Sequence, residues 1–167
     1  MPLSKLREFL DSHNIKYLVI SHSIAYTAQG IAGLVHVSGK KLAKTVIVKM
    51  DGVLAMAVVP ASLHVDLSLL RSVAGADAVE LATEREFTDA FPDCETGAMP
   101  PFGNLYDMPV YVDSSLAEHE EITFTAGTHR ELVRLAWADV VRLVDPQIVN
   151  LVGKHEKDPI RTLRRAS

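Results

Sequence analysis

An Asp-Gly pair between two β-rich runs constrains the fold more than any other feature of the sequence. The runs are TVIVKM at 45–50 and VLAMAVV at 53–59, with Asp51 and Gly52 between them. A two-residue Asp-Gly loop between such runs is a strong hairpin signal, because a type I′ turn needs positive φ at both loop residues. Pro60 cannot donate to a further ladder, so the second strand should end there. The chain is therefore predicted to contain a sheet.

Shorter periodic segments predict helices and strands on both sides of this hairpin. Apolar residues at helical spacing predict an opening helix from Leu3 to about Asn14, and 17–20 is predicted to be a buried strand. Further helices are expected at 23–30, 65–74, 84–90 and 114–119, further strands at 78–82, 110–113 and 122–125, and a strand or turn at 33–39. The segment 129–144 is either one helix or a strand at 131–135 followed by a helix at 138–144. Interleaved strands and short helices indicate an α/β or α+β domain with a mixed sheet.

Length and composition fit one globular domain in a reducing compartment. The chain has 167 residues, of which 48% are hydrophobic, enough for one self-sufficient core. Its single cysteine, Cys94, cannot form an intrachain disulfide or a multi-cysteine zinc site. The longest apolar run, 53–59, is far shorter than the roughly 20 residues that cross a bilayer, and the charged N-terminus disfavours a secretion signal. We expect a cytoplasmic protein that does not enter a membrane and is by default a monomer.

Positive charge is concentrated in two segments of an otherwise acidic chain. The net charge of −4 argues against non-specific coating of nucleic acid. Residues 36–50 hold four lysines and no acid, and residues 154–167 hold five basic and two acidic side chains. Such local patches suit a ligand with a few phosphates, although each could equally be solvated surface. We expect one domain at 1–153 and a basic tail at 154–167.

Two loops and one lysine could carry chemistry. The loop 97–103 (GAMPPFG) contains two glycines that permit positive φ and two prolines that fix their own backbone angles. Such a loop can present main-chain N–H groups to an oxyanion without reorganisation, although an ordinary turn could have the same composition. His129 follows a predicted strand and could donate to a substrate, order a water or be structural. Lys44, where the hairpin begins, could contact a phosphate or be merely solvated.

The familiar catalytic motifs are missing from the sequence. It contains no Gly-x-Ser-x-Gly elbow, no phosphate loop, no Gly-x-Gly-x-x-Gly after a strand and no His-Glu-x-x-His. Cys94 lies three residues before Gly97, but a cysteine of this kind is more often structural than nucleophilic. We therefore predict no bound metal and no cofactor.

Taken together, AKTVIV at 43–48, the loop 97–103 and AGTH at 126–129 resemble the YbaK/prolyl-tRNA synthetase-associated editing family. The resemblance covers roughly 3–144, and the length resembles that of free-standing members. It implies one α/β domain with a mixed, mostly antiparallel sheet flanked by short helices. The implied activity is aminoacyl-tRNA deacylation in trans, which protects translation fidelity. The substrate would be the ester between a wrong amino acid and the 3′-terminal adenosine of a tRNA, typically tRNA for proline, and prolyl-tRNA synthetase is a further candidate partner.

The resemblance also implies site residues. Lys44, Gly97 and His129 match the family positions nearest the chemistry, with Lys44 placed to meet the terminal nucleotide. The implied substrate-binding residues are Thr45, Ala98, Met99, Pro100, Pro101, Phe102, Gly103 and Gly127. Thr45 replaces the asparagine of the alanine-specific subgroup, and Met99-Pro100 stands where several subfamilies have Val-Ser or Cys-Ser. The identity of the rejected amino acid is therefore not inherited from the family.

Ester hydrolysis is compatible with this modest set of groups. An aminoacyl ester is already activated, so a positioned water and stabilisation of the developing oxyanion suffice, and the neighbouring ribose hydroxyl of the substrate could help to activate that water. Two other classes of function stay open from the sequence. One is a non-catalytic module that binds tRNA and protects the ester, and the other is an interaction domain that docks on a synthetase.

Overall fold

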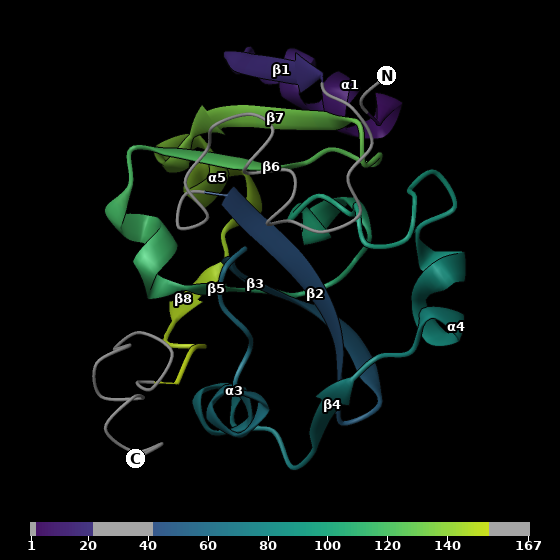
Figure 1. The fold of residues 1–167 in the computed structure, drawn as a ribbon, viewed down its shortest axis with the longest axis vertical. Coiled ribbons are helices and arrows are strands. Elements are labelled where there is room, and N and C mark those ends of the chain that lie inside the picture. Colours follow the sequence, from purple (N-terminus) through teal and green to yellow (C-terminus); the bar gives the residue numbers. More distant parts are fainter. Residues whose placement is uncertain (1–2, 22–41, 154–167) are drawn as a thin grey trace.

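A mixed sheet of eight strands organises the part of the chain that the computed structural model describes, residues 3–21 and 42–153 (Figure 1). The strand order is β1-β7-β6-β2-β3-β5-β8, and β4 pairs with β2 beside that path. The strands are β1 (Tyr17–Ser21), β2 (Leu42–Met50), β3 (Val53–Pro60), β4 (Val79–Leu81), β5 (Val110–Asp113), β6 (Glu121–Thr125), β7 (Glu131–Ala136) and β8 (Gln147–Val149). The elements predicted at 23–30 and 33–39 and the tail 154–167 lie outside the described residues.

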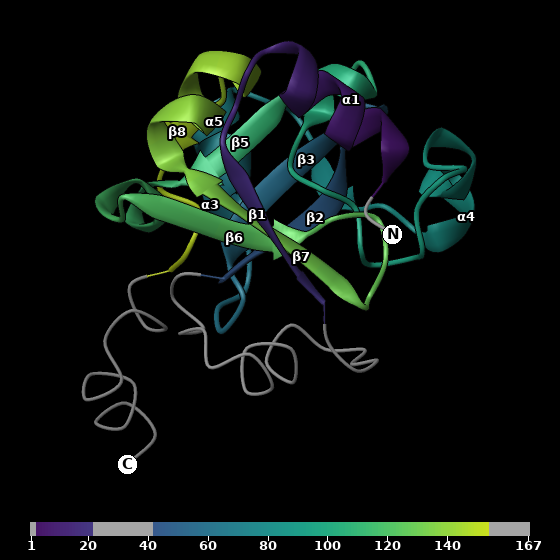
Figure 2. The ribbon, with the colours of Figure 1, turned by 90° about the horizontal axis from the view of Figure 1, so that it is seen from above.

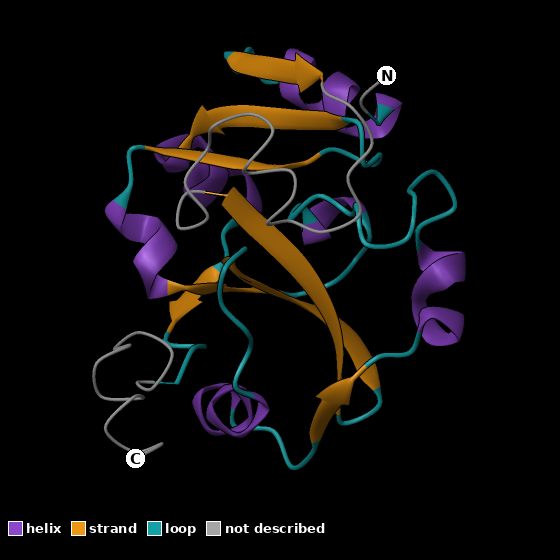
Figure 3. Ribbon diagram, in the orientation of Figure 1, coloured by secondary structure: helices purple, strands orange, loops and turns teal. Residues whose placement is uncertain are grey.

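Short helices surround the sheet (Figure 3). The α-helices are α1 (Ser4–Ser12), α3 (Leu67–Ala74), α4 (Glu84–Phe87) and α5 (Trp137–Val144), and the 3-10 helices are η1 (Thr88–Ala90), η2 (Gly103–Leu105) and η3 (Ser114–Glu118). Local signals set several of these ends. The Asp66 carboxylate accepts the Leu69 N–H at 3.0 Å at the start of α3, and Gly75 ends that helix at φ 68°. In the described ranges no helix is long and apolar enough to cross a membrane.

The predicted hairpin is confirmed and holds the centre of the sheet. Strands β2 and β3 pair antiparallel from Ala43–Pro60 to Met50–Val53, and the turn has φ 50° at Asp51 and 83° at Gly52. The other edge of β2 serves two partners. Its start pairs parallel with β6, and its end pairs antiparallel with β4. β2 therefore pairs with three strands, with β3 along one edge and with β6 and β4 along the other.

Alternation along β2 and β3 separates two cores. Ala43 and Ile47 point into the larger core, which includes Phe102 and Phe124. Val48, with the opposite parity, points into the smaller core, which also holds Leu70, Leu151 and Val152. The chain after β8 returns to this second core: the Leu151 N–H donates to the buried Asp113 carboxylate at 2.8 Å.

Two expectations need correction, one open alternative is decided and one strand was missed. The strand at 17–20 is not buried, because β1 lies at the end of the strand order, where Leu18 is 52% exposed. The helix at 114–119 is the 3-10 helix η3. Of the two alternatives for 129–144, the strand followed by a helix is right, and β8 was not predicted. The predicted domain with a mixed sheet and short helices is otherwise confirmed, with four antiparallel and three parallel pairings among the described strands.

Candidate functional site

A tight turn presents Gly97 at the surface. The Ala98 N–H donates to the Glu95 carbonyl at 3.0 Å, and Gly97 has φ 83°. This hydrogen bond with a positive φ at the third residue is the pattern of a type II turn, where glycine is favoured because a Cβ strains the backbone. Thr96 and Gly97 form the exposed tip of the turn. The residue predicted to begin an oxyanion-binding loop is therefore accessible.

Four hydrogen bonds fasten this turn to the loop that follows β6. The Glu95 N–H donates to the Gly127 carbonyl, and the Gly127 N–H donates to the Ala98 carbonyl, both at 2.8 Å. The Glu95 carboxylate accepts the backbone N–H of His129 at 2.8 Å. The imidazole Nε2 of His129 lies 2.7 Å from the Thr96 carbonyl oxygen. The structure thus brings two of the predicted site segments into direct contact.

His129 orients the main chain of the turn. A carbonyl oxygen only accepts, so the Nε2 that contacts Thr96 carries the proton. The residue is 8% exposed, and its Cε1 would lie 3.5 Å from a Cβ added to Gly97. In a trans peptide the carbonyl and the next N–H point in opposite directions. Because the Thr96 carbonyl faces the imidazole, the Gly97 N–H points away from it.

The start of the chain closes the second loop. Gly127 has φ 95°, and a Cβ there would lie 2.9 Å from the Cβ of Leu3. The Leu3 N–H donates to the Ala126 carbonyl at 2.8 Å. Such a close approach at a positive φ requires glycine. The segment that leads into α1 is therefore fastened directly to the site.

The rest of the predicted substrate-binding loop supports the turn from inside the domain. Five consecutive residues after Gly97 are buried: Ala98, Met99, Pro100, Pro101 and Phe102. Gly103 does not use a positive φ; a Cβ there would lie 2.3 Å from the carbonyl oxygen of Met108. The two glycines thus serve different purposes, conformational at 97 and steric at 103.

Lys44 and Thr45 lie on β2 beside this cluster. The last parallel pair of β2 and β6 joins Ala43 to Phe124, so continuing the register puts Lys44 next to Thr125, where β6 ends. Thr45 shares its face of β2 with Ala43 and Ile47, whereas Lys44 has the opposite parity. Both side chains are half-buried. Hydrogen bonds connect the turn at 95–98 directly to the loop at 126–129. Lys44 is adjacent to that loop only through the pairing of β2 with β6.

Thiol and metal chemistry find little support in the described residues. Burial, the largest cause, raises the pKa of the Cys94 thiol above its ordinary value, and its Sγ lies 3.5 Å from the Tyr106 hydroxyl. A thiol protonated at neutral pH is a poor nucleophile. No group of three or more His, Cys, Asp or Glu side chains suited to a metal occurs among residues 3–21 and 42–153.

Comparison with known families decides the class of this site. The model of a family described as "Aminoacyl-tRNA editing domain" matches residues 22–143. The chain belongs to this family. Membership confirms the resemblance inferred from the sequence, and it confirms the enzyme class: this editing domain is a hydrolase that acts on the ester of aminoacyl-tRNA.

Relatives of the editing domain cover nearly its whole length. The multifunctional Ser/Thr-tRNA deacylase ProXp-y of Escherichia coli K12 is 28% identical over 151 residues, which cover 87% of this chain and 90% of the relative. A crystal structure of a candidate trans-editing enzyme for prolyl-tRNA synthetase superposes with a TM-score of 0.76 at 21% identity, over 89% of this chain and 95% of that one. The hypothetical protein APE2540 gives 0.80 at 18% identity, over 90% and 100%. These two likenesses establish the fold.

Two residues of the editing domain's site were missed from the sequence. Glu95 supplies the carboxylate that holds the His129 backbone, and Thr96 supplies the carbonyl that holds its ring. Both directly precede Gly97, and a polar pair before a glycine is a common turn sequence. That signal was available, but the partner loop that gives the pair its role lies about thirty residues later in the chain.

Proposed function

We propose that this editing domain acts in trans on mischarged tRNA and releases a small hydroxylated amino acid, serine or threonine, with tRNA for proline as the candidate acceptor. A relative named as a Ser/Thr-tRNA deacylase aligns with 87% of the chain, which supports the choice of amino acid. The neighbour linked to prolyl-tRNA synthetase supports the choice of acceptor. We further propose a cytoplasmic monomer.

The direction of the Gly97 N–H carries the proposal. Within the described residues this N–H has no hydrogen-bond acceptor, and it lies at an exposed tip. We assign it to the carbonyl oxygen of the ester, which becomes negatively charged as water attacks. One such donor, already oriented, typically contributes 10²–10³ to kcat. His129 holds the donor in place through Thr96.

The remaining steps use the substrate and one cation. Water attacks the ester carbonyl, and the neighbouring ribose hydroxyl of the terminal adenosine helps to orient it. The bond between the acyl carbon and the ribose oxygen breaks. One proton of the water passes to that oxygen, so the tRNA leaves with a free hydroxyl, and the amino acid leaves as a carboxylate while the other proton passes to solvent. Lys44 contacts a phosphate of the terminal nucleotide as a point charge. The reaction needs no covalent intermediate, since the ester is already activated.

Editing of this kind is needed because synthetases discriminate small side chains weakly. One methylene in a pocket is worth only about 1–3 kcal/mol, so wrong amino acids of similar size are charged at an appreciable rate. A second site that hydrolyses the wrong product restores fidelity.

A substrate panel tests the proposal. Alanyl-, cysteinyl-, seryl- and threonyl-tRNA for proline are each incubated with the protein, and ester loss is measured in single turnover. We expect seryl- and threonyl-tRNA to be hydrolysed fastest. Protection of all four esters against spontaneous hydrolysis would instead identify a binding module, and capture of a synthetase with no ester loss would identify a docking domain.

Lys44→Ala tests the phosphate contact. We expect weaker reaction with charged tRNA and an unchanged fold, whereas Arg71→Ala, which removes a cation from α3 at the other end of the molecule, should leave the rate unchanged (Figure 1). Equal rates for Lys44→Ala and the unsubstituted protein would remove this lysine from the mechanism.

A further inference from the structure

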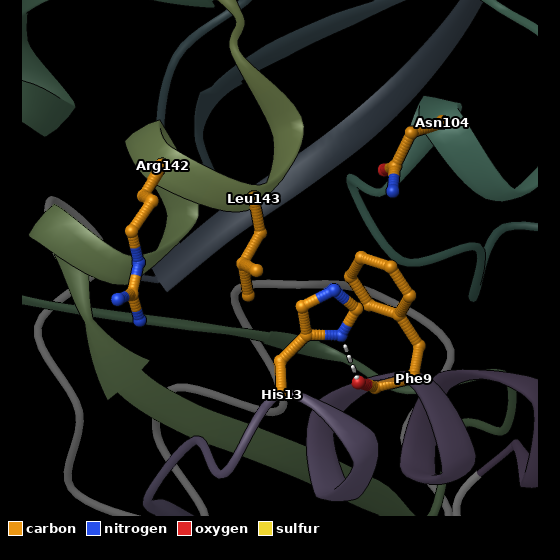
Figure 4. A pocket seen from close by; sticks show the side chains of 5 residues that line it. All are labelled: Phe9, His13, Asn104, Arg142 and Leu143. Atoms are coloured by element: carbon orange, nitrogen blue, oxygen red, sulfur yellow. Dashed lines mark hydrogen bonds between the residues drawn. The ribbon is translucent and has the colours of Figure 1, made fainter.

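A hollow between α1, η2 and α5 contains none of the predicted site residues. Its volume is about 370 Å³, and Figure 4 shows its lining: Phe9, His13, Asn104, Arg142 and Leu143. Three of the five lining side chains are polar and come from three separate segments, and the other two are apolar. Figure 2 shows this arrangement: α1 and α5 lie on the same side of the domain, beside β1, β7 and β6.

His13 presents one defined nitrogen to the hollow. Its Nδ1 lies 2.8 Å from the Phe9 carbonyl oxygen, which only accepts, so Nδ1 carries a proton. The Ser12 hydroxyl lies 3.2 Å from the same nitrogen. The other nitrogen, Nε2, points into the space between Leu143 and Asn104 in Figure 4. It accepts a hydrogen bond when the ring is neutral and donates one when the ring is protonated.

The other side chains complete a set that suits a nucleotide. The Arg142 side chain is 64% exposed and uses one N–H on Asp139 at 2.9 Å, so further donors face outward even though Asp139 neutralises part of its charge. The Asn104 amide, which is exposed, offers both a donor and an acceptor. The Phe9 and His13 rings are in contact, with centroids 4.5 Å apart and planes tilted by 45°. Single-stranded RNA is recognised by such a combination of aromatic or guanidinium stacking and hydrogen bonds to base edges.

A stripe along α1 connects this hollow to the editing site. Lys5, Phe9 and His13 recur every fourth residue, so they lie on one face of the helix. The Lys5 Nζ lies 4.6 Å above the Tyr106 ring, whose hydroxyl contacts Cys94, the residue before the site turn. The stripe therefore begins beside the turn at 95–98 and ends in the hollow.

The length of the stripe sets how many nucleotides it spans. From Lys5 to His13 the stripe rises by eight residues, which corresponds to about 12 Å along the helix axis. A single strand stacked at about 3.4 Å per nucleotide covers that length with about three to four nucleotides. A terminal adenosine at Gly97 would thus place a nucleotide from the same single-stranded end in the hollow.

We propose that the α1 stripe and its terminal hollow bind the single-stranded nucleotides that precede the terminal adenosine of the tRNA. This rests on the proposed function, because it assumes that the adenosine is bound at the turn. Lys5 and Arg142 contact phosphates, and Asn104 and His13 contact the edge of a base.

Substrates of different length isolate this interaction. Arg142→Ala and Asn104→Ala are assayed on seryl-tRNA and on seryl-adenosine, which lacks every upstream nucleotide. Removing one interaction of about 1.4 kcal/mol with a base or a phosphate raises KM about tenfold. We expect that rise on seryl-tRNA and no change on seryl-adenosine. The slope of log KM against log salt concentration for seryl-tRNA should also fall by about 0.7 for each phosphate that the variant no longer neutralises.

The possible results separate this proposal from the proposed function. Equal effects on both substrates, or the same effect from Arg71→Ala on α3, would overturn the proposal. If the unsubstituted protein hydrolyses neither substrate, the proposed function fails, and the stripe is tested by binding of a fluorescent single-stranded RNA that ends in CCA. Unchanged affinity of Arg142→Ala for that RNA overturns the stripe, and about tenfold weaker affinity supports it.

Discussion

Gly97 and Gly52 form a matched pair that separates backbone strain from function. Both have φ 83°, so alanine at either position meets the same conformational penalty. An L-residue in the left-handed region costs about 1–2 kcal/mol. A Cβ on Gly52 would have no atom within 4 Å, and a Cβ on Gly97 would lie 3.5 Å from His129 Cε1, which is ordinary contact. We therefore expect both variants to lose a similar stability, about 1–2 kcal/mol, or a Tm lower by about 2–8 °C.

Only Gly97→Ala should lose activity. The strained turn can relax if the peptide between Thr96 and residue 97 rotates, which converts a type II turn to a type I turn with negative φ at its third residue. That rotation takes the Thr96 carbonyl away from His129 and reverses the N–H of residue 97. Loss of one oriented donor lowers kcat by about 10²–10³.

The assay compares thermal unfolding with single-turnover ester hydrolysis for Gly97→Ala, Gly52→Ala and the unsubstituted protein. Activity of Gly97→Ala equal to that of Gly52→Ala would refute the assignment of the main-chain donor. A Tm decrease much larger at residue 97 than at residue 52 would refute the estimate that both positions carry the same strain.

Three further predictions concern the contacts that support the site and the sheet. Glu95→Ala removes the acceptor of the His129 N–H, so we expect a lower kcat and faster amide exchange at His129. Two controls should change both quantities little: Glu95→Gln keeps an acceptor, and Asp93→Ala removes a nearby charge only. Asp113→Ala leaves the buried Leu151 N–H without its acceptor, which costs about 3 kcal/mol and should lower Tm clearly, with a smaller effect for Asp113→Asn. Hydrogen bonds from Lys49, then from the Thr83 backbone and side chain, lower the pKa of Glu86 from 4.5 to about 2. The ionised Glu86 should therefore stabilise the fold fully above pH 4.5, and this stabilisation should disappear as the pH falls towards 2. Urea unfolding measured at several pH values across that range should show that the free energy of unfolding depends less steeply on pH in Glu86→Gln than in the unsubstituted protein.

Elements with local signals were predictable, and contacts between distant segments were not. The Asp51-Gly52 turn and the Gly75 helix end depend on residues within a few positions, so the sequence placed both correctly. The exposure of β1 depends on where the strand falls in the sheet, which its apolar composition cannot reveal. β8 has three residues and pairs with β5, far away in the chain.

In the candidate site, too, features with a local signal were predictable and contacts between distant segments were not. Gly97 and His129 stood out by residue type, and the resemblance added their roles. The sequence could not show that the two glycines at the ends of the loop have different roles. Gly97 takes a positive φ, whereas Gly103 is required because the carbonyl of Met108 leaves no room for a Cβ. The apolar sequence between them, with Met99 and Phe102, was a usable sign that the loop packs inward.

The shared edge of β2 implies an order of assembly. Strands β2, β3 and β4 are neighbours along the chain and can associate while little else has formed, but the pairing of Leu42 with Thr123 must wait until a large loop has been closed. We therefore expect the half of the sheet that carries the loop after β6, and with it the imidazole, to join β2 after β2, β3 and β4 have paired. A newly made chain would gain secondary structure first and the ability to correct translation errors last.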